Sequence, residues 1–236
     1  MKTVGIVGGV GPESTIAYYR LMVATWRERR PDGSYPSIVI NSIDLKRMLD
    51  LIGADRLEDV TRFLLEEIQR LSRAGADFGM IAANTPHVVF DGLRRGASLP
   101  LISIVEVTCR AAKAQGLKRL ALLGTRFTMQ GRFYPDVFGP AGIDLIVPMP
   151  DEQAYIHEAY MGELVPGRFL PGTRERFGSI IRRLKKKEAI EGVILGGTEL
   201  PLLLRQVDGQ GLPLLDTTRL HVEEAVSQLL TPGREE

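Results

Sequence analysis

Short runs of apolar residues alternate along this chain with longer segments whose apolar positions recur at helical spacing. The apolar runs predict strands at 3–7, 37–41, 78–82, 101–104, 120–123, 144–147, 192–195 and 213–215. The clearest helical segments are 12–29, 56–74, 106–115, 174–187 and 218–229. Strands that are apolar throughout are buried on both faces, and the helices between them cover those faces. We therefore predict an α/β fold built on parallel sheets.

The residues that follow the predicted strands recur at matching intervals. Gly8 and Ala83 are 75 positions apart, and Gly124 and Gly197 are 73 positions apart. This repeat predicts two similar α/β lobes related by a pseudo-twofold. Because ligands of open parallel sheets bind beyond the carboxyl ends of the strands, we expect the site between the lobes. The predicted lobes are residues 1–105 with the C-terminal helix 218–236, and residues 106–217.

Positive and negative charges nearly balance in this chain. It has 30 Lys and Arg residues against 29 Asp and Glu residues, a formal net charge of +1. Such a chain has no overall field to attract nucleic acid or an anionic membrane. It also lacks the features of a secretory signal and any apolar run of the ~18 residues that a membrane helix needs. We expect a cytoplasmic protein whose partner is a small molecule or another protein.

Cysteine and histidine are scarce in this sequence. The single cysteine, Cys109, excludes a disulfide within the chain. With only three histidines beside it, the supply of metal ligands is poor. We therefore predict no metal site.

The loop after the first predicted strand reads GGVGPES over residues 8–14. Pro12 suits the first position of a helix, and the free amides near Val10 and Gly11 would suit a carboxylate or a phosphate. Two other interpretations stay open. A dinucleotide fingerprint would need a third glycine where Ser14 stands, and a plain tight turn would need only the positive φ that glycine adopts.

Two further loops carry polar residues at strand ends. In the first half, Asn84 and Thr85 follow the third predicted strand, and they would either cap the next helix or hold a substrate. His87 lies inside that helical segment, either as a packing residue or as a catalytic group. In the second half, Thr198 and Glu199 follow the seventh strand, where a carboxylate is costly unless it is solvated or paired. We predict a site role for both, with capping and turn formation as alternatives.

Five segments together resemble the aspartate/glutamate racemase family in order and spacing: VGIVGGVGPEST, NTPHVVFD, LLGTRFT, GVILGGTELPLLL and PLLDTTRLHVEEAV. The resemblance spans residues 3–226 and is specific as a set. It implies two α/β lobes with the active site between them. It also implies a cofactor-independent amino-acid racemase, an isomerase without metal or pyridoxal phosphate, that usually forms a homodimer.

Members of that family use two thiols that flank the α-carbon of the substrate, one in a Cys-Asn-Thr segment and one in a Gly-Cys-Thr-Glu segment. The matching positions here are Ala83 and Gly197, and neither side chain exchanges a proton. Cys109 lies in a helical segment and is expected to be a packing residue. Five residues resemble the family's substrate-holding residues: Asn84, Thr85, Thr125, Thr198 and Glu199. The loop amides near Val10 and Gly11, Thr128 in the loop of Thr125, and Arg47 complete the predicted substrate-binding set.

These departures predict a pocket for an acidic amino acid or a dicarboxylate in which two-thiol racemisation is absent. Arg47 or Arg168 would supply a cation for the side-chain carboxylate. Three hypotheses follow. The chain is an enzyme of one-sided chemistry with His87 or Glu199 as its acid or base, a binding or regulatory protein without turnover, or an active racemase whose two cysteines have been replaced.

Overall fold

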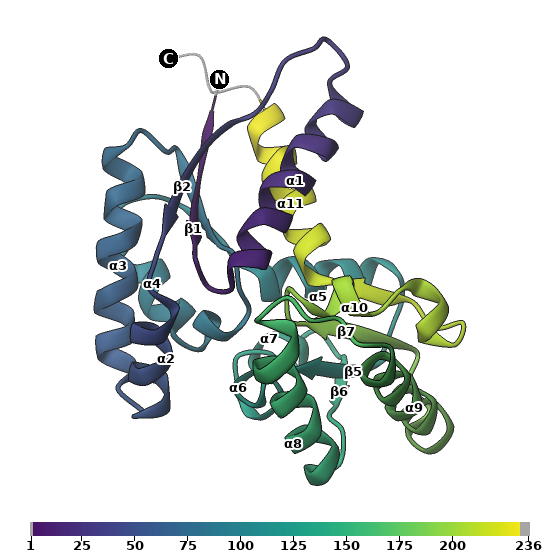
Figure 1. The fold of residues 1–236 in the computed structure, drawn as a ribbon. Helices are drawn as coiled ribbons and strands as arrows, with labels where there is room; N and C mark the ends of the chain where they lie inside the picture. Colours follow the sequence, from purple (N-terminus) through teal and green to yellow (C-terminus); the bar gives the residue numbers. More distant parts are fainter. Residues whose placement is uncertain (1, 232–236) are drawn as a thin grey trace. The chain divides into compact units, whose positions relative to one another are not determined.

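The computed structural model describes residues 2–231. The chain divides into two compact units, and Figure 1 colours them along the sequence. The first unit is made of Met1–Ile104 and His221–Glu236, and the second is Val105–Leu220. The first unit is therefore assembled from two separate stretches of chain, whereas the second is one continuous stretch.

A four-stranded parallel sheet forms the centre of the first unit, in the order β2-β1-β3-β4. Val4, Ile6 and Val7 of the central strand β1 are fully buried, as an entirely apolar strand requires. The four strands are β1 (Thr3–Gly8), β2 (Ser37–Ser42), β3 (Phe78–Ile81) and β4 (Leu101–Ile102).

Helices cover both faces of this sheet. In Figure 1, α2, α3 and α4 lie on one side of the sheet, and α1 lies on the other side beside α11. Arg29 on α1 donates a hydrogen bond to Ser227 on α11 over 2.6 Å, which ties these two helices together. The helices are α1 (Pro12–Arg29), α2 (Leu45–Gly53), α3 (Leu57–Arg73), the 3₁₀ turn η1 (Thr85–Val89), α4 (Phe90–Gly96) and α11 (Thr217–Leu230).

The second unit contains its own four-stranded parallel sheet, in the order β6-β5-β7-β8. Phe177 and Ile181 from α9 and Ile156 from α8 pack in one buried cluster with Leu123 of β5 and Leu195 of β7. The strands are β5 (Arg119–Gly124), β6 (Asp144–Ile146), β7 (Gly192–Gly196) and β8 (Leu214–Asp216).

Besides α11, which begins in the second unit at Thr217, eight helical segments of the described residues belong to or enter this unit. Most are short, and α8 continues directly into a π-helical turn, η2. They are α5 (Ile104–Ala114), α6 (Arg126–Gln130), α7 (Pro135–Phe138), α8 (Pro150–Ala159), η2 (Tyr160–Leu164), α9 (Pro171–Glu188), α10 (Leu200–Leu203) and η3 (Gln206–Gly209).

The two sheets have the same strand order when the numbering is shifted by four. The predicted α/β class and the internal repeat of parallel sheets are therefore confirmed. All eight predicted strands exist, with one clear error of length. The strand predicted at 101–104 ends at Ile102, because α5 begins at Ile104 and takes the last predicted residue into a helix.

Helix α8 and its π-helical turn were not predicted, because the buried side of α8 is partly polar. Glu152 is buried in an ion pair with Arg183, whose Nε lies 2.6 Å from the carboxylate. Gln153 is buried as well and donates to the carbonyl of Pro148 over 2.7 Å. Apolar periodicity therefore misses a helix whose buried polar groups find partners only in the folded chain.

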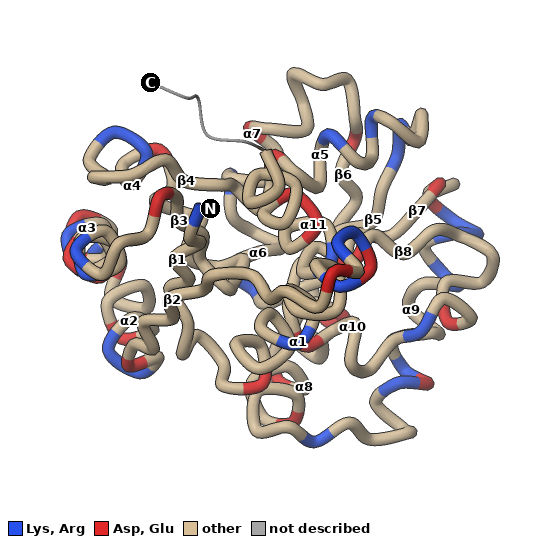
Figure 2. The backbone as a smooth tube through the Cα atoms, turned by 90° about the horizontal axis from the view of Figure 1, so that it is seen from above, with Lys and Arg blue, Asp and Glu red and all other residues tan. Residues whose placement is uncertain are grey.

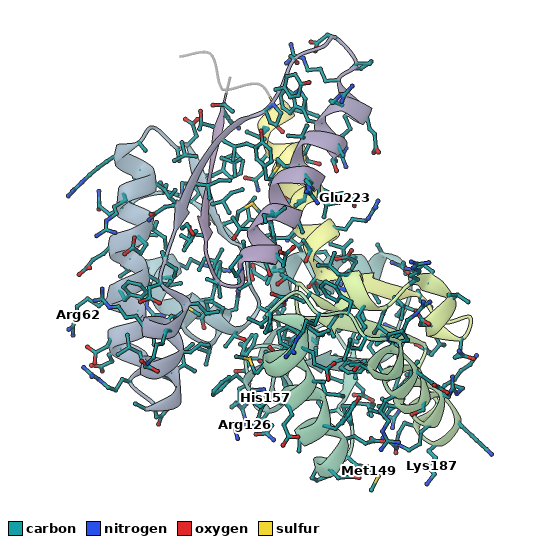
Figure 3. All side chains as sticks on the ribbon, in the orientation of Figure 1. Arg62, Arg126, Met149, His157, Lys187 and Glu223 are labelled. Carbon is teal, nitrogen blue, oxygen red and sulfur yellow. The ribbon has the colours of Figure 1, made fainter. Side chains whose placement is uncertain are left out.

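Charged residues of both signs alternate over the backbone of each unit in Figure 2, in line with the balanced composition. In Figure 3, the labelled Arg62 and Lys187 point away from the helices that carry them. Within residues 2–231, no helix is both long enough and apolar enough to cross a membrane.

Candidate functional site

The strand ends of the first unit gather at one edge of its sheet. The amide of Ala82, just after β3, donates to the carbonyl of Val7 in β1 over 2.9 Å. The amide of Ile43, just after β2, donates to the carbonyl of Gly8 over 3.0 Å. The loops that follow β1, β2 and β3 therefore begin side by side, at the edge where parallel sheets bind ligands.

The loop after β1 needs glycine for its backbone. Gly9 has a φ of 80° and Gly11 a φ of 88°. A Cβ atom at Gly9 would also collide with the backbone of Ile43. Gly11 caps α1 without a side-chain hydrogen bond, and the amide of Gly9 donates to Thr15 Oγ1 over 2.8 Å. The tight-turn interpretation is thus satisfied, and an anion site near Val10 and Gly11 stays a prediction.

Ala83 and the polar pair after it are buried at the end of β3. Ala83 is 6% exposed, Asn84 3% and Thr85 7%. Asn84 precedes the 3₁₀ turn η1 in the capping position, but its side chain makes no capping hydrogen bond. The capping alternative therefore does not explain Asn84, and substrate binding by Asn84 and Thr85 remains the prediction.

His87 uses both ring nitrogens on the backbone of the first unit. Its Nδ1 lies 3.1 Å from the carbonyl of Ala83, and its Nε2 accepts a hydrogen bond from the amide of Ile104 over 3.2 Å. The ring stacks on Phe90, and burial lowers the pKa of His87 to about 3. A neutral imidazole with both nitrogens occupied favours the packing interpretation of His87 over the catalytic one.

The first loop of the second unit, after β5, is organised by a threonine cap. Thr125 Oγ1 accepts a hydrogen bond from the amide of Thr128 over 3.3 Å, and the two hydroxyl oxygens lie 3.3 Å apart. This is the N-cap of the short helix α6. Both threonines therefore have a capping role, and their predicted substrate contacts remain untested.

The loop after β7 contains the second predicted thiol position and a buried carboxylate. Glu199 is 2% exposed, and it accepts hydrogen bonds from Thr198 Oγ1, over 3.0 Å, and from the hydroxyl of Tyr160. The expectation that this carboxylate must be paired is met by two hydroxyl donors. The side chain of Glu199 lies inside the second unit beside Tyr160, a residue that no motif in the sequence singles out.

Tyr160 also occupies the space beside Gly197. A Cβ atom at Gly197 would lie 2.5 Å from Tyr160 Cε2 and 2.7 Å from Tyr160 Oη. Within residues 2–231, eight other glycines have a positive φ, and Gly197 does not. The glycine at 197 is therefore required by the neighbouring ring and not by the backbone angle.

Two predicted cation positions lie on the surface. Arg47 on α2 is exposed, with its guanidinium 4.4 Å from the centre of the Phe63 ring. Arg168 is exposed and donates to the carbonyl of Gly162.

Cys109 is buried with Sγ 3.7 Å from the carbonyl of Val137, and burial raises the pKa of its thiol. It packs as expected and does not replace a thiolate.

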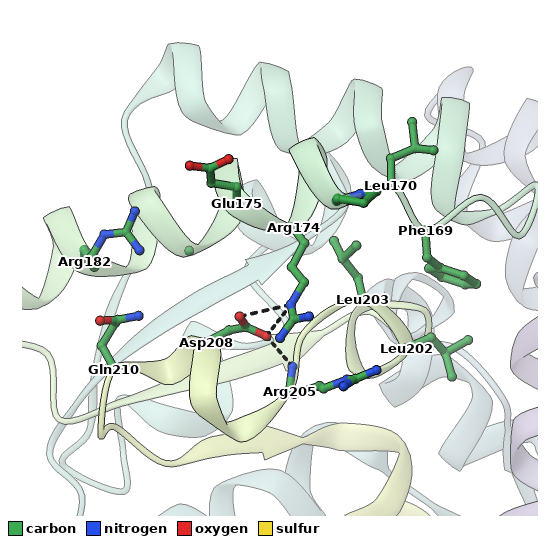
Figure 4. Close-up of a pocket in the computed structure, with 12 residues that line it drawn as sticks. Phe169, Leu170, Arg174, Glu175, Arg182, Leu202, Leu203, Arg205, Asp208 and Gln210 are labelled. Carbon is green, nitrogen blue, oxygen red and sulfur yellow. Dashed lines mark hydrogen bonds and ion pairs between the residues drawn. The ribbon is translucent and has the colours of Figure 1, made fainter.

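A hollow of about 480 Å³ in the second unit lies among α9, α10 and η3, and Figure 4 shows its lining. Arg174 closes one side through an ion pair with Asp208, with Nε 2.9 Å from the carboxylate. None of the predicted site residues lines this hollow. Among the described residues there is also no cluster of three or more His, Cys, Asp or Glu side chains able to hold a metal ion.

The sequence model of the Asp/Glu/Hydantoin racemase family matches residues 7–225. The chain belongs to this family. Its loops after β1, β3, β5 and β7 all fall inside the matched region. The resemblance inferred from the five segments is thus confirmed at the level of the family.

Individual relatives agree with this membership. The chain is 23% identical over 233 residues to the broad-specificity amino-acid racemase RacX of Bacillus subtilis, covering 96% of this chain and 98% of the relative. It is 32% identical to an aspartate racemase homologue from Pyrococcus horikoshii, with a TM-score of 0.85 over 98% of this chain and 100% of that one. The aspartate racemase of Picrophilus torridus, at 20% identity, a TM-score of 0.81 and coverage of 97% and 94%, shares the fold.

Proposed function

We propose that this chain binds an acidic amino acid through the polar loops at its strand ends and does not run two-thiol racemisation. The observation that carries the proposal is the pair Ala83 and Gly197. They follow β3 and β7, which occupy equivalent places in the two sheets, and neither has an ionisable group.

The preserved polar residues support binding. Asn84 and Thr85 in the first unit and Thr198 and Glu199 in the second unit are each less than a tenth exposed. These four residues resemble the family's substrate-holding residues, and all four are kept although both thiols of the family are absent from this chain. In the arrangement that the family resemblance implies, the ligand lies in the cleft between the lobes. By that resemblance we also expect a cofactor-independent homodimer in the cytoplasm.

Relatives indicate the ligand class. The named racemases among them act on amino acids, with broad specificity in Bacillus subtilis and on aspartate in Picrophilus torridus. A preserved pocket without thiols would therefore keep the ligand of such an enzyme and lose the proton transfer. General acid and base groups typically contribute about 10²–10⁴-fold each, so losing both removes most of the rate even when the ligand is held well.

A ligand screen by thermal shift tests the proposal. D- and L-aspartate, D- and L-glutamate and simple dicarboxylates are added to the intact chain, because a ligand that binds the native state raises the melting temperature. At least one of these should stabilise the protein, and Asn84→Ala or Thr198→Ala should reduce the shift. An unchanged melting temperature with every ligand would refute the assignment of the pocket.

One-sided chemistry is a second candidate function, favoured by the buried carboxylate of Glu199. A single base would remove the α-proton from one face and return it there, so solvent deuterium would enter without racemisation. Incubation in D₂O followed by proton NMR distinguishes the two functions. Exchange that is lost in Glu199→Gln supports the enzyme, and no exchange supports the binding protein.

A further inference from the structure

The hollow among α9, α10 and η3 has the size of a binding site for a small molecule. Its volume is about 480 Å³, and such sites typically measure about 300–1,000 Å³. It lies wholly within the second unit, and none of the residues described above as substrate contacts lines it. The chemistry of its ligand therefore has to be inferred from its own lining.

One face of helix α9 forms a wall of the hollow. Arg174, Gly178 and Arg182 line it, and their spacing of four residues places them on the same face of the helix. The glycine between the two arginines has helical geometry and no positive φ. Apart from the backbone of its own helix, a Cβ atom there would lie 3.6 Å from Arg182 Nη1, which is an ordinary contact.

The fold does not explain this glycine. Glycine inside a helix is less stable than alanine, because glycine loses more conformational freedom on folding. An alanine at 178 would fit, so neither the backbone angle nor the packing excludes a side chain. What the glycine provides is open space between Arg174 and Arg182, and a ligand that contacts both guanidinium groups would lie in this space.

Positive charge exceeds negative charge around the hollow. The ion pair with Asp208 uses Nε of Arg174, and the terminal nitrogens of this arginine have no hydrogen-bond partner among residues 2–231. In the same described part of the chain, Arg182 and Arg205 have no carboxylate partner. With Glu175, the lining contains three arginines and two carboxylates, which leaves one net positive charge. This charge is complementary to a ligand with a single negative charge.

The opposite end of the hollow is apolar. Figure 4 shows four apolar side chains gathered at the end away from Arg182: Phe169, Leu170, Leu202 and Leu203. Leu170 is 46% exposed and Leu202 is 44% exposed, so a ligand that covers them would remove apolar surface from water. A ligand that fills the hollow therefore has an apolar part as well as a negative charge.

We propose that this hollow binds a monocarboxylate that carries an apolar group. The carboxylate lies on the guanidinium groups beside Gly178, which pair with it through parallel hydrogen bonds, and the apolar group lies against Leu202. The carboxylate of Glu175 disfavours a second negative charge on the ligand. This is a second site, and it does not rest on the proposed function.

Chemical-shift titration of the ¹⁵N-labelled chain tests the proposal with phenylacetate and 4-phenylbutyrate. Both should shift amide signals of α9 and η3 around the hollow. 2-Phenylethanol keeps the ring and lacks the charge, and it should bind about tenfold more weakly, because hydrogen bonds to charged groups contribute the most. Phenyl phosphate, which carries more negative charge, should bind no more tightly than phenylacetate.

Gly178→Leu and Gly172→Leu form a matched pair on α9. Gly178 lines the hollow and Gly172 does not, and a Cβ atom at Gly172 would meet nothing within 4 Å. Leucine at 178 should fill the space between the arginines and lower the affinity for phenylacetate by about tenfold or more. Leucine at 172 should leave the affinity unchanged.

Arg182→Gln carries the test if Gly178→Leu does not fold. It removes one charge from the lining and should weaken phenylacetate binding by about threefold, as expected for a partly solvated ion pair. Lys186→Gln removes the same charge from α9 outside the hollow and is its control.

Four results would contradict the proposal. Three would overturn the site itself: titrations without shifts around the hollow, equal binding of 2-phenylethanol and phenylacetate, and an unchanged affinity in both Gly178→Leu and Arg182→Gln. The fourth, tighter binding of phenyl phosphate than of phenylacetate, would overturn the assignment of a monocarboxylate.

Discussion

The ends of β3 and β7 are equivalent positions in the two sheets. They differ in what occupies the place that, by the family resemblance, would hold a cysteine side chain. After β3, Ala83 is a short side chain beside a histidine whose nitrogens bond to the backbone. After β7, Gly197 has no side chain, and Tyr160 takes the space. The first position carries only a methyl group, and the space beside the second is filled by the ring of Tyr160. Under the proposed function, two-thiol chemistry would therefore need one substitution in the first unit and two in the second.

The largest expected effect separates these two cases. Ala83→Cys with Gly197→Cys should leave racemisation of aspartate near background, because the second thiol would collide with Tyr160. Adding Tyr160→Ala clears the space and should raise the rate of racemisation by about 10²–10⁴-fold. Chiral chromatography of the aspartate measures this rate. Equal rates in the double and triple variants would show that Tyr160 does not block position 197, and ordinary racemase activity in the unmodified chain would refute the lost-base argument altogether.

Acid should weaken the first unit more than the second. Burial lowers the pKa of His87 to about 3 and of His221 to about 4, below the ~6.5 of an unfolded histidine. The unfolded chain therefore binds more protons below pH 6.5. Stability is then lost as the pH falls from 6.5 toward 4, by about 1.4 kcal/mol per pH unit for each histidine.

Urea unfolding followed by Trp26 fluorescence measures this loss, because the single tryptophan lies on α1 in the first unit. His221→Gln should reduce the pH slope. Its imidazole links Tyr18, over 2.9 Å, to the carbonyl of Ile102, over 3.0 Å, so the variant also has a lower stability at neutral pH. A slope unchanged in this variant would assign the acid sensitivity elsewhere.

A smaller effect tests whether the ring of Tyr160 is the reason why position 197 is a glycine. Gly197→Ala should destabilise the chain by about 1–3 kcal/mol, because overpacking forces neighbouring groups to shift. In a Tyr160→Ala background the same substitution should cost much less, and the difference is the coupling energy of the pair. Ala83→Ser in the first unit is the comparison with no such ring. Additive effects in the double-mutant cycle would show that the backbone, and not the ring of Tyr160, is the reason why position 197 is a glycine.

The smallest effect concerns the polar residues beside the two positions. Thr125→Ala removes the cap of α6 and should cost about 1 kcal/mol, whereas Asn84→Ala, with no capping hydrogen bond to lose, should cost less on that account. Thermal unfolding without ligand compares them. If Asn84 proved the costlier substitution, its unliganded role would be structural.

The fold was predictable from the sequence because each strand and the turn after it are encoded by residues that are neighbours in the sequence. Buried parallel strands are continuous apolar runs, and the glycines and threonines after them mark the same edge of each sheet. The site was predictable only in part. Asn84, Thr85, Thr198 and Glu199 stand at strand ends, where ligands of parallel sheets bind. Tyr160 precedes Gly197 by 37 positions and begins the π-helical turn η2, which no pattern in the sequence predicted. Its contact with Gly197 exists only in the folded chain.

The interrupted path of the chain has a consequence for the order of folding. The second unit is complete at Leu220, whereas the first lacks its final helix segment until His221 and the residues after it have been made. The hydrogen bond between Tyr18 and His221 closes 203 positions of sequence, and such distant contacts form late. During synthesis the second unit therefore has all its strands before the first can be closed. The first unit, which contains the strands synthesised first, is therefore completed last, when residues from His221 onward have been made.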